Sequence, residues 1–171
     1  MDYNERYDNS GNMRQKDLVL ATNEFCFLQN KTNGQIKTYT GPITTTISAQ
    51  EALVVFNTKT KRFEETTNFE TAKQLFISAP EGWYVVLKNP TTDEQYPSPG
   101  TANQTPSTIK IGTKVNVFGP TSFALYPGQM AKVVKGHRLR SNQYLLARVY
   151  DANAANKNSE KATIVNTDGK E

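Results

Sequence analysis

The sequence predicts an all-β protein built from two to three small antiparallel β modules in series, with flexible arms at its N- and C-terminal ends. Short runs rich in aromatic and β-branched residues recur along the chain, and Gly, Pro and Asn separate them. The order of strands and Gly-Pro pairs also occurs twice. Aromatic residues make up 10% of the chain, too many for a disordered polypeptide, so we expect a packed core.

The first module is expected over residues 18–74, after a polar arm at residues 1–17. The run 24–29 is apolar and aromatic, and Asn33-Gly34 is a strong signal for the turn of a β-hairpin. Residues 35–39 form the expected return strand, which Gly41-Pro42 ends because proline has no N–H to donate. The other elements expected here are strands at 53–56 and 62–65 and one helical turn at 68–73.

The second module and a partial third one are expected over residues 75–154, followed by a flexible tail at 155–171. Strands are predicted at 74–78, 83–88 and 114–118. Residues 91–108 are rich in Pro, Thr and other polar residues, which predicts a long polar loop.

Two Gly-Pro pairs indicate an internal duplication. A strand that begins at Glu24 leads to Gly41-Pro42, and a strand placed from Glu81 leads to Gly119-Pro120. The polar loop accounts for the greater length of the second unit. We therefore predict two related units and a third, partial unit that begins at Tyr126.

The candidate binding residues lie in a basic block. Residues 110–148 contain seven Lys or Arg side chains and no Asp or Glu, although the net charge of the whole chain is only +4. Arg138 and Arg140 are expected on one side of a strand, where guanidinium groups can bind carboxylate or phosphate. Three interpretations remain open: contact with an acidic protein, contact with nucleic acid, or a solvated strand face. The residues proposed to contact a partner are Lys132, Lys135, His137, Arg138, Arg140 and Arg148.

No catalytic, cofactor-binding or metal-binding site is expected. Cys26 lies in an apolar run, which favours burial as a small hydrophobic residue, and the single histidine, His137, is far from it along the chain. The paired carboxylates at 64–65 and 93–94 lie in polar segments, where nothing would raise their pKa values. The sequence has no phosphate-binding loop, no nucleophile elbow, no signal peptide and no run of membrane-spanning length.

Three segments occur in an order that resembles a known family. They are Glu24-Phe25-Cys26-Phe27-Leu28 through Gly41-Pro42 to Leu53-Val54-Val55-Phe56, then residues 79–90, then residues 123–129 with 142–151. Together they resemble the N-terminal repeats of major vault proteins. The resemblance implies small antiparallel β modules stacked in series, without a catalytic role, in a protein that assembles side by side into a large shell. The chain departs from the family because no long shoulder or coiled-coil region follows the modules.

The chain is rich in Lys, Asn and Thr and has polar ends, and in these respects it is similar to virion proteins of tailed phages, the crAss-like group included. We therefore expect a non-enzymatic structural assembly protein, an accessory or decoration component of a phage capsid. Such a protein would be made in the host cytoplasm and reside in the virion. Its expected partners are the major shell subunits, with no membrane and no cofactor. The alternatives are a basic nucleic-acid-binding module and a vault-like subunit that assembles its own shell.

Overall fold

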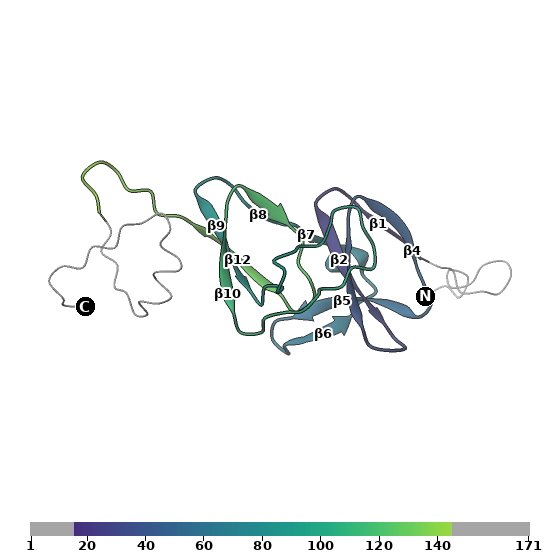
Figure 1. The fold of residues 1–171 in the computed structure, drawn as a ribbon. Helices are drawn as coiled ribbons and strands as arrows, with labels where there is room; N and C mark the ends of the chain where they lie inside the picture. The colour runs from purple at the N-terminus through teal and green to yellow at the C-terminus, as the bar shows by residue number, and fades with distance from the viewer. Residues whose placement is uncertain (1–15, 145–171) are drawn as a thin grey trace. The chain divides into compact units, whose positions relative to one another are not determined.

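The computed structural model describes residues 16–144, and the predicted all-β class is confirmed (Figure 1). The chain divides into two compact units, residues 1–136 and 137–171, and the strands of the described part all lie in the first unit. The elements are β1 (Lys16–Leu20), β2 (Glu24–Asn30), β3 (Ile36–Thr40), β4 (Ile43–Ile47), β5 (Glu51–Asn57), β6 (Arg62–Glu65), α1 (Phe69–Ala72), β7 (Gln74–Leu75), β8 (Ile77–Ala79), β9 (Trp83–Lys88), β10 (Lys114–Phe118), β11 (Thr121–Phe123) and β12 (Met130–Lys135).

The first half of this unit is an antiparallel sheet ordered β3-β2-β5-β6, with β7 also paired to β2, and a separate pair of β1 and β4. The predicted hairpin between β2 and β3 is confirmed, and Gly34 in its turn has a φ of 72°, which glycine adopts without steric cost. Asn68 caps the predicted helical turn, because its side chain accepts hydrogen bonds from the backbone N–H groups of Glu70 and Thr71.

The second half repeats this plan with fewer residues in strands. β9 is the central strand of a sheet ordered β10-β9-β12, and β8 pairs with β11. The predicted strands at 83–88 and 114–118 have these bounds in the structure. The predicted loop at 91–108 contains no strand, although isolated bridges join Thr91 to Ile109 and Gln104 to Thr38.

The strand register confirms the predicted duplication. β1 pairs with β4 as β8 pairs with β11, and β2 lies between β3 and β5 as β9 lies between β10 and β12. Individual residue pairs recur as well, at equivalent places in the two halves. Phe25–Thr40 recurs as Tyr84–Phe118, Phe27–Val54 recurs as Val86–Lys132, and Leu18–Thr45 recurs as Ile77–Phe123. We call the two halves module 1 (residues 16–75) and module 2 (residues 76–136).

The register also corrects the predicted alignment. Trp83 of β9, and not Glu81, corresponds to Glu24, because the N–H of Gly41 donates to Glu24 O and the N–H of Gly119 donates to Trp83 O. The strand that follows Tyr126 is β12, which pairs with β9 as β5 pairs with β2. Residues 126–135 therefore complete module 2, and the prediction that a third unit begins at Tyr126 is wrong.

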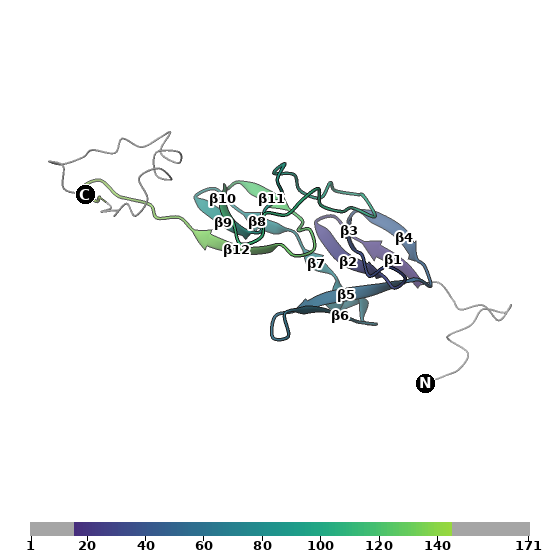
Figure 2. The same ribbon diagram turned by 60° about the horizontal axis from the view of Figure 1, so that its bottom comes forward.

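Module 1 is buried on both faces of its sheet because alternate residues of β2 point into different cores. Cys26 and Leu28 pack with Leu18 and Leu20 of β1, within the module. The second core lies between the modules and joins buried residues of both. Its members are Phe25, Phe27, Val54, Phe76, Ala79, Val85, Leu87, Phe123, Ala124 and Leu125. The layers therefore follow one another as the β1–β4 pair, the sheet around β2, the β8–β11 pair and the sheet around β9 (Figures 1 and 2).

The long loop of module 2 covers the outer edge of β3. The backbone N–H groups of Thr38 and Thr40 donate to the carbonyls of Gln104 and Thr101, at 2.8 and 3.1 Å. Gln104 extends this contact, since its side-chain amide donates to the Thr40 hydroxyl oxygen at 3.0 Å. An edge strand of module 1 is thus closed by module 2, which removes unpaired backbone groups that would otherwise bind another strand.

Several boundaries differ from the prediction. Lys16 and Asp17 were expected in the arm but belong to β1 and pair with β4. Residues 1–15 and the tail at 155–171 lie outside the described part. The strand expected at 74–78 is two short strands, β7 and β8, separated at Phe76. β4 and β11 were not predicted, because their runs ITTTI and TSF carry little apolar surface and are fixed by pairing with β1 and β8.

Candidate docking surfaces

The predicted partner-binding residues are divided between the two units. Lys132 and Lys135 lie on β12 in the first unit, and both are exposed. His137, Arg138 and Arg140 are exposed residues of the second unit. Arg148 lies outside the described residues. The five described side chains are therefore considered in two sets, one in each unit.

Arg138 and Arg140 are not on a strand, which corrects the prediction. β12 ends at Lys135, and residues 136–140 have no regular secondary structure. In the described part, ion pairs join only Lys31 to Glu65 and Lys73 to Glu70, so no acidic side chain neutralises these two arginines there. With respect to residues 16–144, their guanidinium groups can donate hydrogen bonds to an external carboxylate or phosphate.

Residues 140–143 form a turn that also occurs twice in the first unit. The N–H of Gln143 donates to Arg140 O at 3.0 Å, and the side-chain oxygen of Gln143 accepts from the N–H of Arg140 at 3.0 Å. Asn142, the third residue of this turn, has a φ of 71°. The turns at 21–24 and 126–129 have the same two hydrogen bonds and a positive φ at Asn23 and Gly128. The pattern of Asn or Gly followed by Glu or Gln marks these turns in the sequence.

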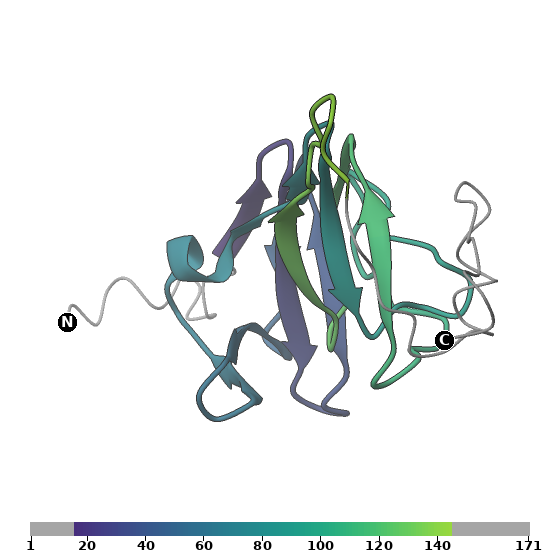
Figure 3. The same cartoon turned by 90° about the vertical axis from the view of Figure 1, so that its left-hand side faces the viewer.

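A second surface is the outer face of the β10-β9-β12 sheet, which we call the end face (Figure 3). Val85 and Leu87 of β9 point into the core, so the alternate residues of the sheet point away from it. The end face consists of Tyr84, Val86 and Lys88 on β9, Lys114, Asn116 and Phe118 on β10, and Met130, Lys132 and Val134 on β12.

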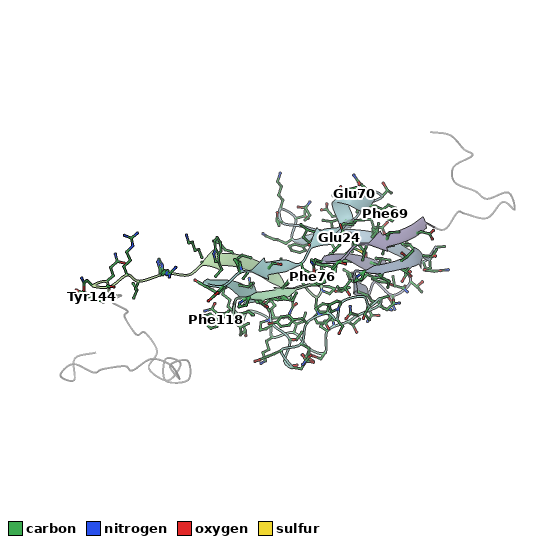
Figure 4. All side chains as sticks on the ribbon, turned by 90° about the horizontal axis from the view of Figure 1, so that it is seen from above. Glu24, Phe69, Glu70, Phe76, Phe118 and Tyr144 are labelled. Carbon is green, nitrogen blue, oxygen red and sulfur yellow. The ribbon has the colours of Figure 1, made fainter. Side chains whose placement is uncertain are left out.

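The end face combines apolar surface with positive charge. Phe118 is 75% exposed and Met130 is 40% exposed. Figure 4 labels Phe118 at this end of the first unit, whereas Phe76 lies between the two sheets. Lys88 and Lys114 are directly opposite each other in the register, and Lys132 lies on the same face. The sheet contributes no carboxylate to this face, so its chemistry suits a partner that is apolar at its centre and acidic or neutral at its rim.

The sequence interpretation found only Lys132 on the end face. Phe118 was expected as part of a strand, and strand alternation places Lys114, Asn116 and Phe118 on one face. Nothing in that alternation says whether a further layer covers the face. The exposure of Phe118 follows from the layer order, which depends on long-range pairing.

A hollow of about 290 Å³ also lies within the first unit, between the β5–β6 hairpin and the start of β12. Its walls are mainly apolar and include Phe27, Phe56, Phe63, Leu125 and Met130. The phenyl ring of Phe63 packs edge-on against those of Phe27 and Phe56, with centroid distances of 5.6 and 5.3 Å. The hollow can hold an apolar side chain but offers no group for chemistry.

The thiol of Cys26 and the carboxyl groups of Glu64 and Asp93 have pKa values shifted from their ordinary ones. Cys26 is fully buried, and burial raises the pKa of its thiol to about 12, so it is not a thiolate near neutral pH. Hydrogen bonds from Asn57 and Thr60 lower the pKa of Glu64, and the backbone N–H of Gln95 lowers that of Asp93; both groups are therefore carboxylates rather than proton donors. Within residues 16–144, no group of His, Cys, Asp and Glu is arranged to hold a metal ion.

No protein-family model, curated protein or solved structure matches the chain. Among residues 16–144, no helix has the length and apolar character required to cross a membrane.

Proposed function

We propose that this chain is a non-enzymatic structural assembly protein, an accessory or decoration component of a phage capsid that binds the major shell subunits. The main support is the way its modules stack. Module 2 covers Phe25, Phe27 and Val54 on one face of module 1, and one core unites the two modules. Duplicated modules joined in this way make a rigid spacer whose surface, rather than a cleft, meets partners.

The docking part of the proposal rests on the basic block. Arg138 and Arg140 are exposed and form no ion pair with a residue of the described part of the chain. Guanidinium groups in this state form charge-assisted hydrogen bonds with carboxylates on an acidic shell surface. Lys132 and Lys135 contribute long-range attraction, which raises the rate of encounter more than the final affinity.

The test is binding of the Arg138→Glu, Arg140→Glu double variant to purified shell particles. We expect at least about a tenfold loss of affinity, because like charges across an interface are repelled. The matched control is Lys59→Glu, Lys61→Glu, which changes the net charge equally at exposed positions in the turn between β5 and β6. Equal occupancy by wild type and the arginine variant would exclude docking through this block.

The same exposed cations also support the alternative of a nucleic-acid-binding module. Phosphate contacts release counterions, so the affinity of such a module falls steeply as salt is added. Titration of duplex DNA and RNA at low salt separates the two proposals. Binding that weakens steeply with salt and is lost in the arginine variant would favour nucleic acid over a protein shell.

A further inference from the structure

The end of β12 repeats the passage from module 1 into module 2. Leu75 of β7 pairs with Glu24 at the start of β2, and Lys135 of β12 pairs with Trp83 at the start of β9. Glu24 and Trp83 are equivalent residues, because the carbonyl of each accepts a hydrogen bond from the glycine N–H of a Gly-Pro pair. Lys135 therefore corresponds to Leu75, which lies just before β8.

The residue that follows each of these positions makes the same backbone contact. The N–H of Phe76 donates to Asn23 O at 2.7 Å, and the N–H of Gly136 donates to Gly82 O at 2.9 Å. Asn23 and Gly82 are equivalent, since both have a positive φ before the central strand of a sheet. Gly136 thus corresponds to Phe76, and the second compact unit begins directly after it, at His137.

The turn at residues 140–143 extends this correspondence into the second unit. It matches the turn at 80–83, because in each the N–H of the fourth residue donates to the carbonyl of the first at 3.0 Å. The third residue has a positive φ in both turns, 78° at Gly82 and 71° at Asn142. Asn142 also follows the end of β12 at the same spacing as Gly82 follows the end of β7. The turn at 140–143 therefore lies where a central strand would begin.

Residues 137–139 accordingly hold the place of β8, although they pair with no strand in the described part of the chain. Leu139 corresponds to Ala79 of β8 and to Leu20 of β1, and each of those two residues is only 2% exposed. Leu139 itself is 50% exposed among the residues that the structure describes. The equivalent positions therefore predict that a further strand covers this side chain.

The sequence after the turn has apolar residues where a central strand requires them. The third and fifth residues after the positive-φ position are buried in both modules; they are Cys26 and Leu28 in module 1, and Val85 and Leu87 in module 2. The same two positions after Asn142 are Leu145 and Ala147, which are apolar and lie outside the described residues.

We propose that a third module begins at residue 137 and that residues 144–150 form its central strand, with the side chain of Leu139 packed against that strand. Leu20 of β1 packs against β2 in this way within module 1. Residues 144–150 are the segment that covers Leu139, because they follow the turn directly and have the required alternation of side chains. This start lies after β12, which completes module 2.

The third module gives the two exposed arginines a defined place. Arg138 corresponds to Ser78, and Arg140 corresponds to Pro80. Ser78 and Pro80 are exposed even though module 2 shares a core with module 1. Both guanidinium groups therefore occupy positions that stay accessible, while Leu139 between them points inward. This inference rests on the proposed assembly role, and it names the folded element that holds the arginines for an acidic shell surface.

The first test measures hydrogen exchange in the purified full chain by mass spectrometry, without shell particles. In wild type, the amides of residues 145–150 are expected to exchange at least about tenfold more slowly than in a peptide of that sequence, because a paired strand withdraws its N–H groups from water. Leu139→Ser should abolish this protection. Arg138→Ser is the matched control, since it changes the neighbouring outward position and should retain the protection.

Protection of residues 24–30 and 83–88 verifies that modules 1 and 2 stay folded in both variants. Exchange of residues 145–150 at the peptide rate in wild type would overturn the third module. Undiminished protection in Leu139→Ser would overturn it as well, because Leu139 would then not belong to its core.

The second test measures binding of the same variants to purified shell particles. Leu139→Ser keeps both arginines but should bind at least about threefold more weakly than wild type, because the guanidinium groups are no longer held in one geometry. Equal affinity of Leu139→Ser and wild type would show that the module does not position the arginines. If wild type does not bind shell particles, the docking role fails, and the exchange experiment still decides whether the third module exists.

Discussion

Cys26 and Tyr39 are two weak acids that folding removes from water. Burial raises the pKa of Cys26 to about 12, and the cation of Lys73 opposes this only in part. Burial also raises the pKa of Tyr39, and the carboxylate of Glu51, 3.1 Å from its hydroxyl, raises it further. Both groups are neutral in the folded state at pH values where the unfolded chain has begun to ionise. Their contribution to stability is therefore complete below the unfolded pKa values and declines above them.

This linkage predicts alkaline destabilisation in two steps. We expect the urea midpoint to fall as pH rises above 9.0, the ordinary value for cysteine, and to fall more steeply above 10.0, the ordinary value for tyrosine. Cys26→Ala should lower stability at every pH but remove the first part of the pH dependence. Tyr39→Phe should reduce the second part, and burial of Tyr96 and Tyr126, which raises the pKa of both hydroxyls, accounts for the remainder. A midpoint that is constant from pH 8 to pH 11 would contradict the burial of both groups.

At the scale of elements, the same turn occurs in a buried form at residues 126–129 and in an exposed form at residues 140–143. The side-chain oxygen of Gln129 accepts from the N–H of Tyr126 at 2.9 Å, and its amide donates to Asn89 O at 3.2 Å, with Gln129 and Tyr126 both buried. Gln143 accepts from the N–H of Arg140 in the same way but is exposed. Water can replace the hydrogen bond made by the exposed Gln143, but it cannot replace the one made by the buried Gln129.

Gln129→Ala should therefore cost about 1–3 kcal/mol, because it leaves a buried N–H without an acceptor. Gln143→Ala should change stability by no more than about 0.5 kcal/mol. Chemical denaturation followed by far-UV circular dichroism, which reports on the whole chain, measures both. Equal losses in the two variants would show that the turns are stabilised by something other than their side-chain hydrogen bonds.

The same elements show where sequence reasoning succeeds and where it stops. Asn33-Gly34 and the apolar runs at 83–88 are local signals, and they predicted a hairpin and a strand correctly. The duplication was predicted with strands taken to begin at Glu24 and Glu81. The residues that correspond in the structure are Asn23 and Gly82, because both adopt a positive φ before the strand. The backbone conformation of the turn therefore marks equivalent positions better than the expected start of the strand.

At the scale of the whole molecule, the candidate surfaces depend on contacts that no local pattern encodes. Lys132 was found from its charge, whereas the exposure of Phe118 depends on the absence of a further layer within residues 16–136. Whether the predicted modules on either side of residue 74 are independent likewise depends on how the halves pack. The core between them contains Phe25 and Val54 from one side and Leu87 and Phe123 from the other. We expect such a core to couple the folding of both modules.

The chain carries its own reporters for this coupling, one in each module. Trp83, the single tryptophan, begins β9 in module 2, and Cys26, the single cysteine, is buried within module 1. In urea, the fluorescence of Trp83 and the protection of Cys26 from a thiol reagent should be lost at one midpoint, as two-state unfolding requires.

Leu87→Ala tests whether destabilisation of module 2 also destabilises module 1. Leu87 belongs to the core between the modules and is 1% exposed. The substitution should cost about 2–5 kcal/mol and lower both midpoints together. Ser122→Ala, at an exposed position of module 2, is the control that should move neither by much. If Leu87→Ala lowers the Trp83 midpoint and leaves Cys26 protected as in wild type, the modules fold independently and the shared core does not couple them.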